Sequence, residues 1–252
     1  MNPRTETGTI RSKDTARDRD GNESLGAELE PGATHYRAFV GPPRDYDLVA
    51  AMTFSLLTAL GLRQHHDVLD VGCGSLRIGR LLIPYLNRGR YTGLEPNSWL
   101  VAEGIQRECG PDQIEIKQPH FVFEDNLDSF GPDIRFDFAI AQSIFSHAGL
   151  DVISRWLADL GRVLPDRGAL IATYIEGEED HPNRGWIYPE CVSYRRSTIE
   201  GLATDFGFEF RPLDWRHPRQ SWALFTHEGF PTDWLDSGAL SWNHSFDAGR
   251  WS

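Results

Sequence analysis

Lysine is almost absent from this chain of 252 residues, which contains only Lys13 and Lys117. Arginine therefore supplies nearly all of the positive charge, and 25 basic residues face 37 acidic ones, for a net charge of −12. A large nucleic-acid interface depends on clustered Lys and Arg side chains that neutralise phosphates. The acidic balance argues against such an interface, and we expect no nucleic-acid partner. A local, arginine-rich anion site remains open.

Cysteine and long apolar runs are scarce as well. Cys73, Cys109 and Cys191 lack the paired spacing of metal ligands, and an odd, scattered set of thiols is typical of a reducing compartment. The sequence has no run of eighteen apolar residues, so we expect no transmembrane helix and no membrane partner. The N-terminal sequence lacks the apolar core of a secretory signal. Together these features predict a cytoplasmic protein.

Composition divides the chain into three regions. Residues 1–30 are polar, which predicts a disordered or loosely packed arm. Residues 31–228 carry the apolar patterns of one globular domain. Residues 229–252 form a tail that we expect to pack on the domain or on a partner subunit, because exposed tryptophan is unfavourable. The tail contains Trp234, Trp242 and Trp251. A homodimer is therefore left open.

Strand and helix patterns alternate through the domain. This alternation predicts an α/β fold with a mostly parallel sheet covered on both faces. The last two strands are too close in sequence for a helical crossover and should form an antiparallel hairpin. The expected strands are 67–71, 90–95, 119–123, 136–141, 169–175, 208–214 and 221–227, and the expected helices are 46–62, 76–87, 98–109, 151–163 and 197–206.

The run from Val68 to Gly74 is an apolar strand that ends in a Gly-rich turn, and the run from Gly93 to Asn97 is a strand end that carries Glu95. In open α/β sheets, nucleotide-like ligands bind at the carboxyl ends of the strands, where a carboxylate accepts hydrogen bonds from ribose hydroxyls. A dinucleotide fingerprint would need a third glycine, but Arg77 stands there. This departure disfavours a nicotinamide-dependent dehydrogenase.

Four segments resemble, in the right order, the class I S-adenosylmethionine-dependent methyltransferases. Asp70–Gly74 is similar to motif I, Tyr91–Asn97 to the ribose-binding strand end, Phe136–Ser143 to the fourth strand, and Leu164–Ile171 to the turn into the fifth. The resemblance covers roughly residues 66–175. It implies a Rossmann-like, seven-stranded, mostly parallel sheet with helices on both faces and a terminal antiparallel hairpin. It also implies S-adenosyl-L-methionine as the cofactor.

The resemblance assigns cofactor-binding roles by position. Asp70 would attract the methionine ammonium group, and Glu95 would bind both ribose hydroxyls. Arg77 would bind the methionine carboxylate, with an ordinary surface arginine as the alternative. A polar residue after the third strand would contact the adenine. Asp125 and Asn126 are the candidates for this role, with Glu124 as a rival. The predicted cofactor-binding set is Asp70, Gly72, Cys73, Gly74, Arg77, Glu95, Pro96, Asn97, Asp125, Asn126 and Gln142.

Catalysis and acceptor binding depend on less specific signals. Gln142 stands where metal-using relatives place an acid, and glutamine is a poor ligand for a hard cation, so we expect no metal. A hydroxyl acceptor would need a general base, for which His147 is the first candidate and His181, in the long loop 176–192, the second. Either histidine is otherwise an ordinary structural residue. The predicted acceptor-binding residues are Tyr36, Ser143, Phe145, Trp186 and Tyr188.

The resulting hypothesis is a metal-independent, in-line transfer of a methyl group to a small-molecule acceptor, with oxygen favoured over nitrogen, carbon or sulfur. Methylation of a protein or an RNA is one alternative. Ala141–Ile144 differs from the Pro-Pro-Tyr type of tetrapeptide that amino-group methyltransferases carry after the fourth strand. A non-catalytic S-adenosylmethionine-binding protein is another alternative, because the cofactor motifs alone do not establish turnover.

Overall fold

The computed structural model of the chain describes residues 25–237 and residue 240. Most of the predicted N-terminal arm and most of the tail, including Trp242 and Trp251, lie outside the described residues. Trp234 does lie within them, and its side chain packs against one of the two clusters of buried apolar residues that form the core. No helix in the described part of the chain is long and apolar enough to cross a membrane.

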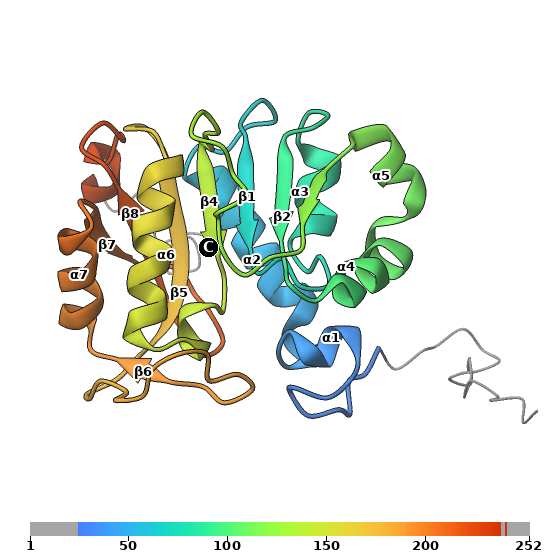
Figure 1. The fold of residues 1–252 in the computed structure, drawn as a ribbon, viewed down its shortest axis with the longest axis horizontal. Helices are drawn as coiled ribbons and strands as arrows, with labels where there is room; N and C mark the ends of the chain where they lie inside the picture. Colours follow the sequence, from blue (N-terminus) through green and yellow to red (C-terminus); the bar gives the residue numbers. More distant parts are fainter. Residues whose placement is uncertain (1–24, 238–239, 241–252) are drawn as a thin grey trace, which may run out of the picture.

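The fold centres on an eight-stranded sheet whose main path runs β3-β2-β1-β4-β5-β8-β7 (Figure 1). Strands β1 to β5 pair in parallel, while β8 is antiparallel to both β5 and β7. The mostly parallel sheet with a terminal hairpin confirms the predicted fold class. The strands of this path are β1 (Val68–Val71), β2 (Tyr91–Leu94), β3 (His120–Val122), β4 (Phe138–Ala141), β5 (Ala169–Glu176), β7 (Glu209–Leu213) and β8 (Ser221–Thr226).

Helices cover both faces of the sheet, as Figure 1 shows. Leu69 of β1 belongs to the buried cluster that includes α6 and α7, whereas its neighbour Val68 belongs to the cluster that includes α2, α3 and α4. This alternation follows from the two-residue period of a strand, which sends successive side chains to opposite faces. The helices are α2 (Tyr46–Ala59), α3 (Gly79–Tyr85), α4 (Ser98–Gly104), α5 (Pro111–Lys117), α6 (Leu150–Val163) and α7 (Arg196–Asp205).

The elements that sequence patterns miss are short, and the longest is α5 with seven residues. Strand β6 (Ser193–Tyr194) pairs in parallel with the last residues of β5, and two residues are too few to show an alternating pattern. Helix α1 is a single turn, and the remaining turns are 3-10 or π helices. These short elements are α1 (Tyr36–Phe39), η1 (Pro43–Asp45), η2 (Ile105–Cys109), η3 (Phe145–His147) and η4 (Asp233–Ser237). The expected helix 98–109 is divided between α4 and the π helix η2.

The start of α3 differs from the prediction for a clear reason. Leu76 has a φ of 60°, which is the left-handed region that L-residues with large side chains rarely adopt. The chain therefore continues in turns until Gly79 instead of entering the helix at residue 76. This longer Gly-rich turn lies at the carboxyl edge of the sheet, next to the ends of β2 and β4.

The order of the strands determines where a ligand site can form. From β1 the chain builds outward through β2 and β3 on one side, and through β4 and β5 on the other. The two loops that leave β1 and β4 consequently diverge and open a crevice at the switch point. In Figure 1 the carboxyl ends of the parallel strands form the lower edge of the sheet, where both α1 and β6 lie.

Candidate cofactor and acceptor site

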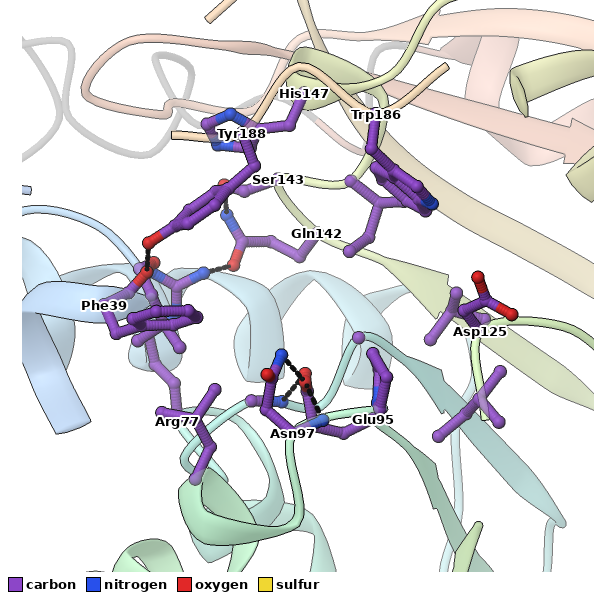
Figure 2. Close-up of a pocket in the computed structure, with 18 of the residues that line it drawn as sticks. Phe39, Arg77, Glu95, Asn97, Asp125, Gln142, Ser143, His147, Trp186 and Tyr188 are labelled. Atoms are coloured by element: carbon purple, nitrogen blue, oxygen red, sulfur yellow. Dashed lines mark hydrogen bonds between the residues drawn. The ribbon is translucent and has the colours of Figure 1, made fainter. Parts of the chain in front are cut away.

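A cavity of about 320 Å³ occupies the carboxyl ends of β1, β2 and β4 (Figure 2). Twelve of the predicted site residues line it: Gly72, Gly74, Arg77, Glu95, Pro96, Asn97, Asp125, Gln142, Ser143, His147, Trp186 and Tyr188. They come from segments that are far apart in sequence. The fold therefore brings most of the predicted cofactor residues and most of the predicted acceptor residues to one pocket.

Glu95 lies directly after β2 and is only 6% exposed. One oxygen of its carboxylate accepts hydrogen bonds from the backbone N–H and the side chain of Asn97, at 2.9 and 2.7 Å. The other oxygen accepts from the backbone N–H of Gly74, at 3.2 Å. These contacts join the Gly-rich turn to the end of β2 and hold the carboxylate at the pocket wall (Figure 2). The oxygen that Gly74 contacts has a second lone pair that can accept from a ligand hydroxyl, whereas both lone pairs of the other oxygen are already used by Asn97.

The two glycines of the turn allow neighbouring side chains of the pocket wall to pack closely against its backbone. Gly72 and Gly74 have φ values of 66° and 54°, in the region that favours glycine. A Cβ at Gly72 would lie 2.2 Å from Ile144, and one at Gly74 would lie 2.6 Å from Val40. Larger residues would therefore displace two of the side chains that line the pocket.

Arg77 extends from the turn into the pocket. Its guanidinium donates to the backbone carbonyl of Val40 at 2.8 Å and to the side-chain oxygen of Gln142. Both partners are neutral, and within the described residues no carboxylate forms an ion pair with Arg77. Burial lowers its pKa to about 10, so it remains a cation at neutral pH. A desolvated cation without an anionic partner is costly, which makes this position suited to an anionic ligand group.

His147 lies in η3, after the end of β4. Its Nδ1 is 2.6 Å from the backbone oxygen of Glu190. A carbonyl oxygen only accepts hydrogen bonds, so Nδ1 carries the proton and Nε2 of the neutral ring keeps its lone pair. Burial lowers the pKa of His147, the charge of Arg77 lowers it further, and the Glu190 carbonyl opposes both. The ring is therefore held as a neutral hydrogen-bond acceptor.

Aromatic side chains form the outer wall of the pocket. The Tyr188 hydroxyl donates to the backbone oxygen of Phe39 at 2.7 Å, and the two rings lie 5.0 Å apart. Phe39 also contacts Trp99 of α4 at 5.3 Å. Trp186 lines the pocket from the same loop as Tyr188 and is 43% exposed (Figure 2). Phe39 was not predicted, although the aromatic run around residue 36 was a signal for it.

Other lining residues had no recognisable sequence signal. Trp156 of α6 lines the pocket, but in the sequence it is one apolar position of an amphipathic helix. Glu124, which the sequence offered as a rival for the adenine contact, lies in the wall beside Asp125. The remaining unpredicted lining residues are apolar: Val40, Val71, Leu94, Leu100 and Ile144.

Two predicted cofactor residues lie below the Gly-rich turn, outside the residues that line the cavity. Asp70 is 2% exposed and accepts a hydrogen bond from the Tyr91 hydroxyl at 2.7 Å. Burial raises the pKa of Asp70 to about 7. Cys73 is buried on the same side. The strand period explains this placement, because Val71 faces the cavity and Asp70 therefore faces away from it.

Two of the predicted acceptor-binding residues, Tyr36 and Phe145, lie outside the pocket for reasons of packing. Tyr36 donates to Glu108 at 2.9 Å beside Arg37, away from the pocket. Phe145 is fully buried and packs edge-on against Phe225 in the core.

Asn126 and His181 are also absent from the cavity wall. The Asn126 side chain accepts from the backbone of Asp128, at 2.9 Å. His181 donates its backbone N–H to the oxygen of Ser193, at the beginning of β6. Of the two candidate bases, the fold brings only His147 to the pocket.

The part of the chain covered by the structure contains no group of three or more His, Cys, Asp and Glu side chains placed to hold a metal ion. Three acidic residues, Glu95, Glu124 and Asp125, line the pocket, but their side chains do not form such a group.

Comparison with known proteins adds independent findings. Residues 69–170 match a family model described as a methyltransferase domain. The human MTRF1L release factor glutamine methyltransferase is 24% identical over 163 residues, which are 51% of this chain and 47% of the human protein. The chain thus spans about half the length of this curated relative.

Solved structures share the fold. Magnesium protoporphyrin IX methyltransferase from Synechocystis PCC 6803, solved with bound S-adenosylmethionine, is 18% identical, with a TM-score of 0.57 over 83% of this chain and 95% of that one. The 1,6-didemethyltoxoflavin-N1-methyltransferase of Burkholderia thailandensis is 18% identical, with a TM-score of 0.52 over 72% of this chain and 78% of that one. The family match over residues 69–170 and the strand order together confirm the resemblance of this chain to the class I S-adenosylmethionine-dependent methyltransferases, whose fold it shares.

Proposed function

We propose that the chain binds S-adenosylmethionine in this pocket and transfers its methyl group to a hydroxyl of a small molecule, without a metal. The observation that carries the proposal is the presence of two opposite charges in one largely apolar pocket. Glu95 offers a carboxylate with spare acceptor capacity, and Arg77 offers a cation without an anionic partner. These are the charges that ribose hydroxyls and a methionine carboxylate require.

The other residues of the pocket fit the remaining parts of the cofactor. The backbone of Gly72 and Gly74 lines the pocket, and Ile144 and Val40 pack where the Cβ atoms of larger residues would lie. Asp125 or Glu124 is placed to accept from the adenine amino group, and Leu100 offers an apolar surface to the ring. When bound, the cofactor supplies a methyl group on a positively charged sulfur, which a nucleophile attacks in line.

The preference for an oxygen acceptor rests on His147. A hydroxyl is a weak nucleophile until its proton is removed, and Nε2 of His147 is held as a neutral acceptor by the Glu190 carbonyl. The aromatic wall excludes water and orients the acceptor for attack. A neutral amine attacks through its own lone pair and a thiol ionises readily, so a hydroxyl is the acceptor that depends most on this base.

The small size of the acceptor is supported by the apolar pocket and by the structural neighbours, whose names give magnesium protoporphyrin IX and 1,6-didemethyltoxoflavin as their substrates. The name of the human relative instead gives a protein glutamine as the methylated group. At the end of β4, Ala141–Ile144 differs from the Pro-Pro-Tyr type of tetrapeptide that amino-group methyltransferases carry, which favours the small-molecule acceptor.

Calorimetric titration tests the proposal directly. We expect S-adenosylmethionine and S-adenosylhomocysteine to bind the protein and NAD not to bind. Binding of NAD alone, or of none of the three, would overturn the proposal. Binding of both sulfur ligands without methylation of any hydroxylated acceptor would favour a non-catalytic binding protein.

Replacing Arg77 with glutamine should weaken S-adenosylhomocysteine binding by about tenfold or more, because a charged hydrogen bond to the carboxylate is lost. The same variant should bind methylthioadenosine, which has no carboxylate, as tightly as the wild type does. Calorimetry on both ligands measures the difference. Arg162→Gln, on the surface of α6, serves as the matched control. An equal loss for both ligands would show that Arg77 acts through the shape of the pocket.

A further inference from the structure

A continuous series of hydrogen bonds links Arg77 to Ser143 at the acceptor end of the pocket (Figure 2). A guanidinium can only donate, so the side-chain oxygen of Gln142 must face Arg77. The Gln142 amide nitrogen therefore faces Ser143, and it lies 2.6 Å from the Ser143 hydroxyl oxygen. The Ser143 oxygen accepts this hydrogen bond.

A second amide approaches the same hydroxyl. The side-chain nitrogen of Gln220, which immediately precedes β8, is 3.0 Å from the Ser143 oxygen and 3.2 Å from that of Ser146. A hydroxyl has two lone pairs and one hydrogen. In this orientation of the Gln220 amide, whose oxygen is buried without a hydrogen-bond partner among the described residues, both lone pairs of Ser143 are occupied by amide donors and its own hydrogen is left to donate elsewhere. Because Ser143 lines the cavity, the pocket is where a partner can be found.

The backbone holds Ser143 in this position. Its φ is 62°, and its N–H donates to the Thr173 hydroxyl of β5 at 2.8 Å. Four residues further along the chain, His147 offers the opposite property, since its Nε2 accepts. The acceptor end of the pocket therefore presents one donor and one acceptor, separated by a single helical turn, η3.

The walls around this pair are aromatic. Tyr188 packs against His147 with its ring centre 5.3 Å away, and Trp186 stands across the pocket from it in Figure 2. Two rings with space between them suit a flat ligand, because aromatic groups pack by offset stacking or by edge contacts.

We propose that the acceptor is an aromatic ring with a hydroxyl and a neighbouring oxygen that accepts a hydrogen bond, and that Ser143 selects it by donating to that second oxygen. This inference rests on the proposed methyl transfer. The reacting hydroxyl gives its proton to Nε2 of His147 as its oxygen forms the new bond to the methyl carbon. The electron pair of the broken carbon–sulfur bond stays on sulfur, so atoms and charges balance.

Two matched pairs of phenols test the proposal. In 2-methoxyphenol and 2-ethylphenol, an oxygen of the first compound is replaced by a methylene of similar size in the second. The naphthalene pair 3-methoxy-2-naphthol and 3-ethyl-2-naphthol repeats the comparison on a larger ring. With S-adenosylmethionine as donor, we expect the wild type to have a kcat/KM about tenfold higher for the methoxy compound of each pair.

Ser143→Ala should reduce this ratio to about one, because the donor to the second oxygen is gone. Ser146→Ala is the matched control, since it removes the other hydroxyl that Gln220 contacts and does not line the pocket. It should keep the ratio of the wild type. Calorimetry with S-adenosylhomocysteine verifies that both variants retain a folded cofactor site.

The possible failures are distinct. A wild type that binds no S-adenosylhomocysteine contradicts the proposed function itself. A wild type that binds it but methylates none of the four phenols, or does so with a ratio near one, overturns the proposed acceptor class. If Ser143→Ala lowers both members of a pair equally and the ratio persists, Ser143 has a structural role and does not select the acceptor.

Discussion

Replacing His147 with asparagine is expected to lower kcat by about 10²–10⁴-fold, the usual contribution of a general base. Asparagine retains an N–H that can donate to the Glu190 carbonyl, as Nδ1 of the histidine does. It has no basic nitrogen in place of Nε2, so the acceptor hydroxyl keeps its proton. The affinity for S-adenosylhomocysteine should not change. Steady-state kinetics and calorimetry measure the two quantities separately.

The matched control for this experiment is His181→Asn. The sequence offered both histidines as bases, but His181 is not among the residues that line the cavity. This variant should retain the kcat of the wild type. If it lost activity and His147→Asn did not, the assignment of the base would be wrong.

The pH profile provides an independent check on His147. Burial holds its pKa below the usual value of 6.5, so the neutral, proton-accepting form persists to lower pH than for an exposed histidine. The plateau of kcat/KM should therefore extend below pH 6.5, and the rate should fall only as pH drops through the lowered pKa. A rate that rises on acidification would be inconsistent with a base at this position.

Local patterns in the sequence were sufficient for the parts of the site that single segments build. The apolar run before Gly72 and the acid after β2 predict a crevice, because parallel strands end at a common edge. Glu95 and Gly74 indeed meet there, with a hydrogen bond between them. The terminal hairpin followed from the short spacing of the last two strands, and the seven-stranded, mostly parallel sheet followed from the family resemblance.

Contacts between distant segments could not be predicted in this way. Phe39 and Tyr188 are far apart in sequence, and only the folded chain brings the hydroxyl of one to the backbone of the other. The placement of Asp70 is different, since the alternation of side chains along β1 could have shown that it faces away from Val71. The family resemblance assigned Asp70 to the methionine ammonium group, directly or through water, whereas the strand geometry places its carboxylate under the turn.

The two candidate bases show most clearly what the sequence alone could not predict. In the sequence, both histidines follow strands, His147 in an Ile-Phe-Ser-His run and His181 in a polar, turn-rich loop. What separates them is a backbone carbonyl, that of Glu190, which lies in a loop between β5 and β6. Backbone partners leave no trace in the identity of a side chain, so the tautomer of His147 becomes apparent only in three dimensions.

Replacing Glu95 with glutamine is expected to raise the Kd for S-adenosylmethionine by about 100-fold or more. Two hydroxyls that donate to a carboxylate contribute roughly 1.5–3 kcal/mol each. The glutamine amide has only one acceptor oxygen and no charge, so it binds the two hydroxyls more weakly. Glutamine keeps the length of the side chain, so the pocket retains its shape. Calorimetry on the wild type and the variant measures the change.

A modified ligand identifies the cause of this loss. The wild type should bind the 2′-deoxy analogue of S-adenosylhomocysteine more weakly than the parent compound, whereas Glu95→Gln should distinguish the two far less. Asn97→Ala removes a donor to the carboxylate but leaves its charge, so its effect should be below about tenfold. If Glu95→Gln discriminated between the ligands as well as the wild type does, the carboxylate would not bind the ribose, and its contacts with Gly74 and Asn97 would be its main role.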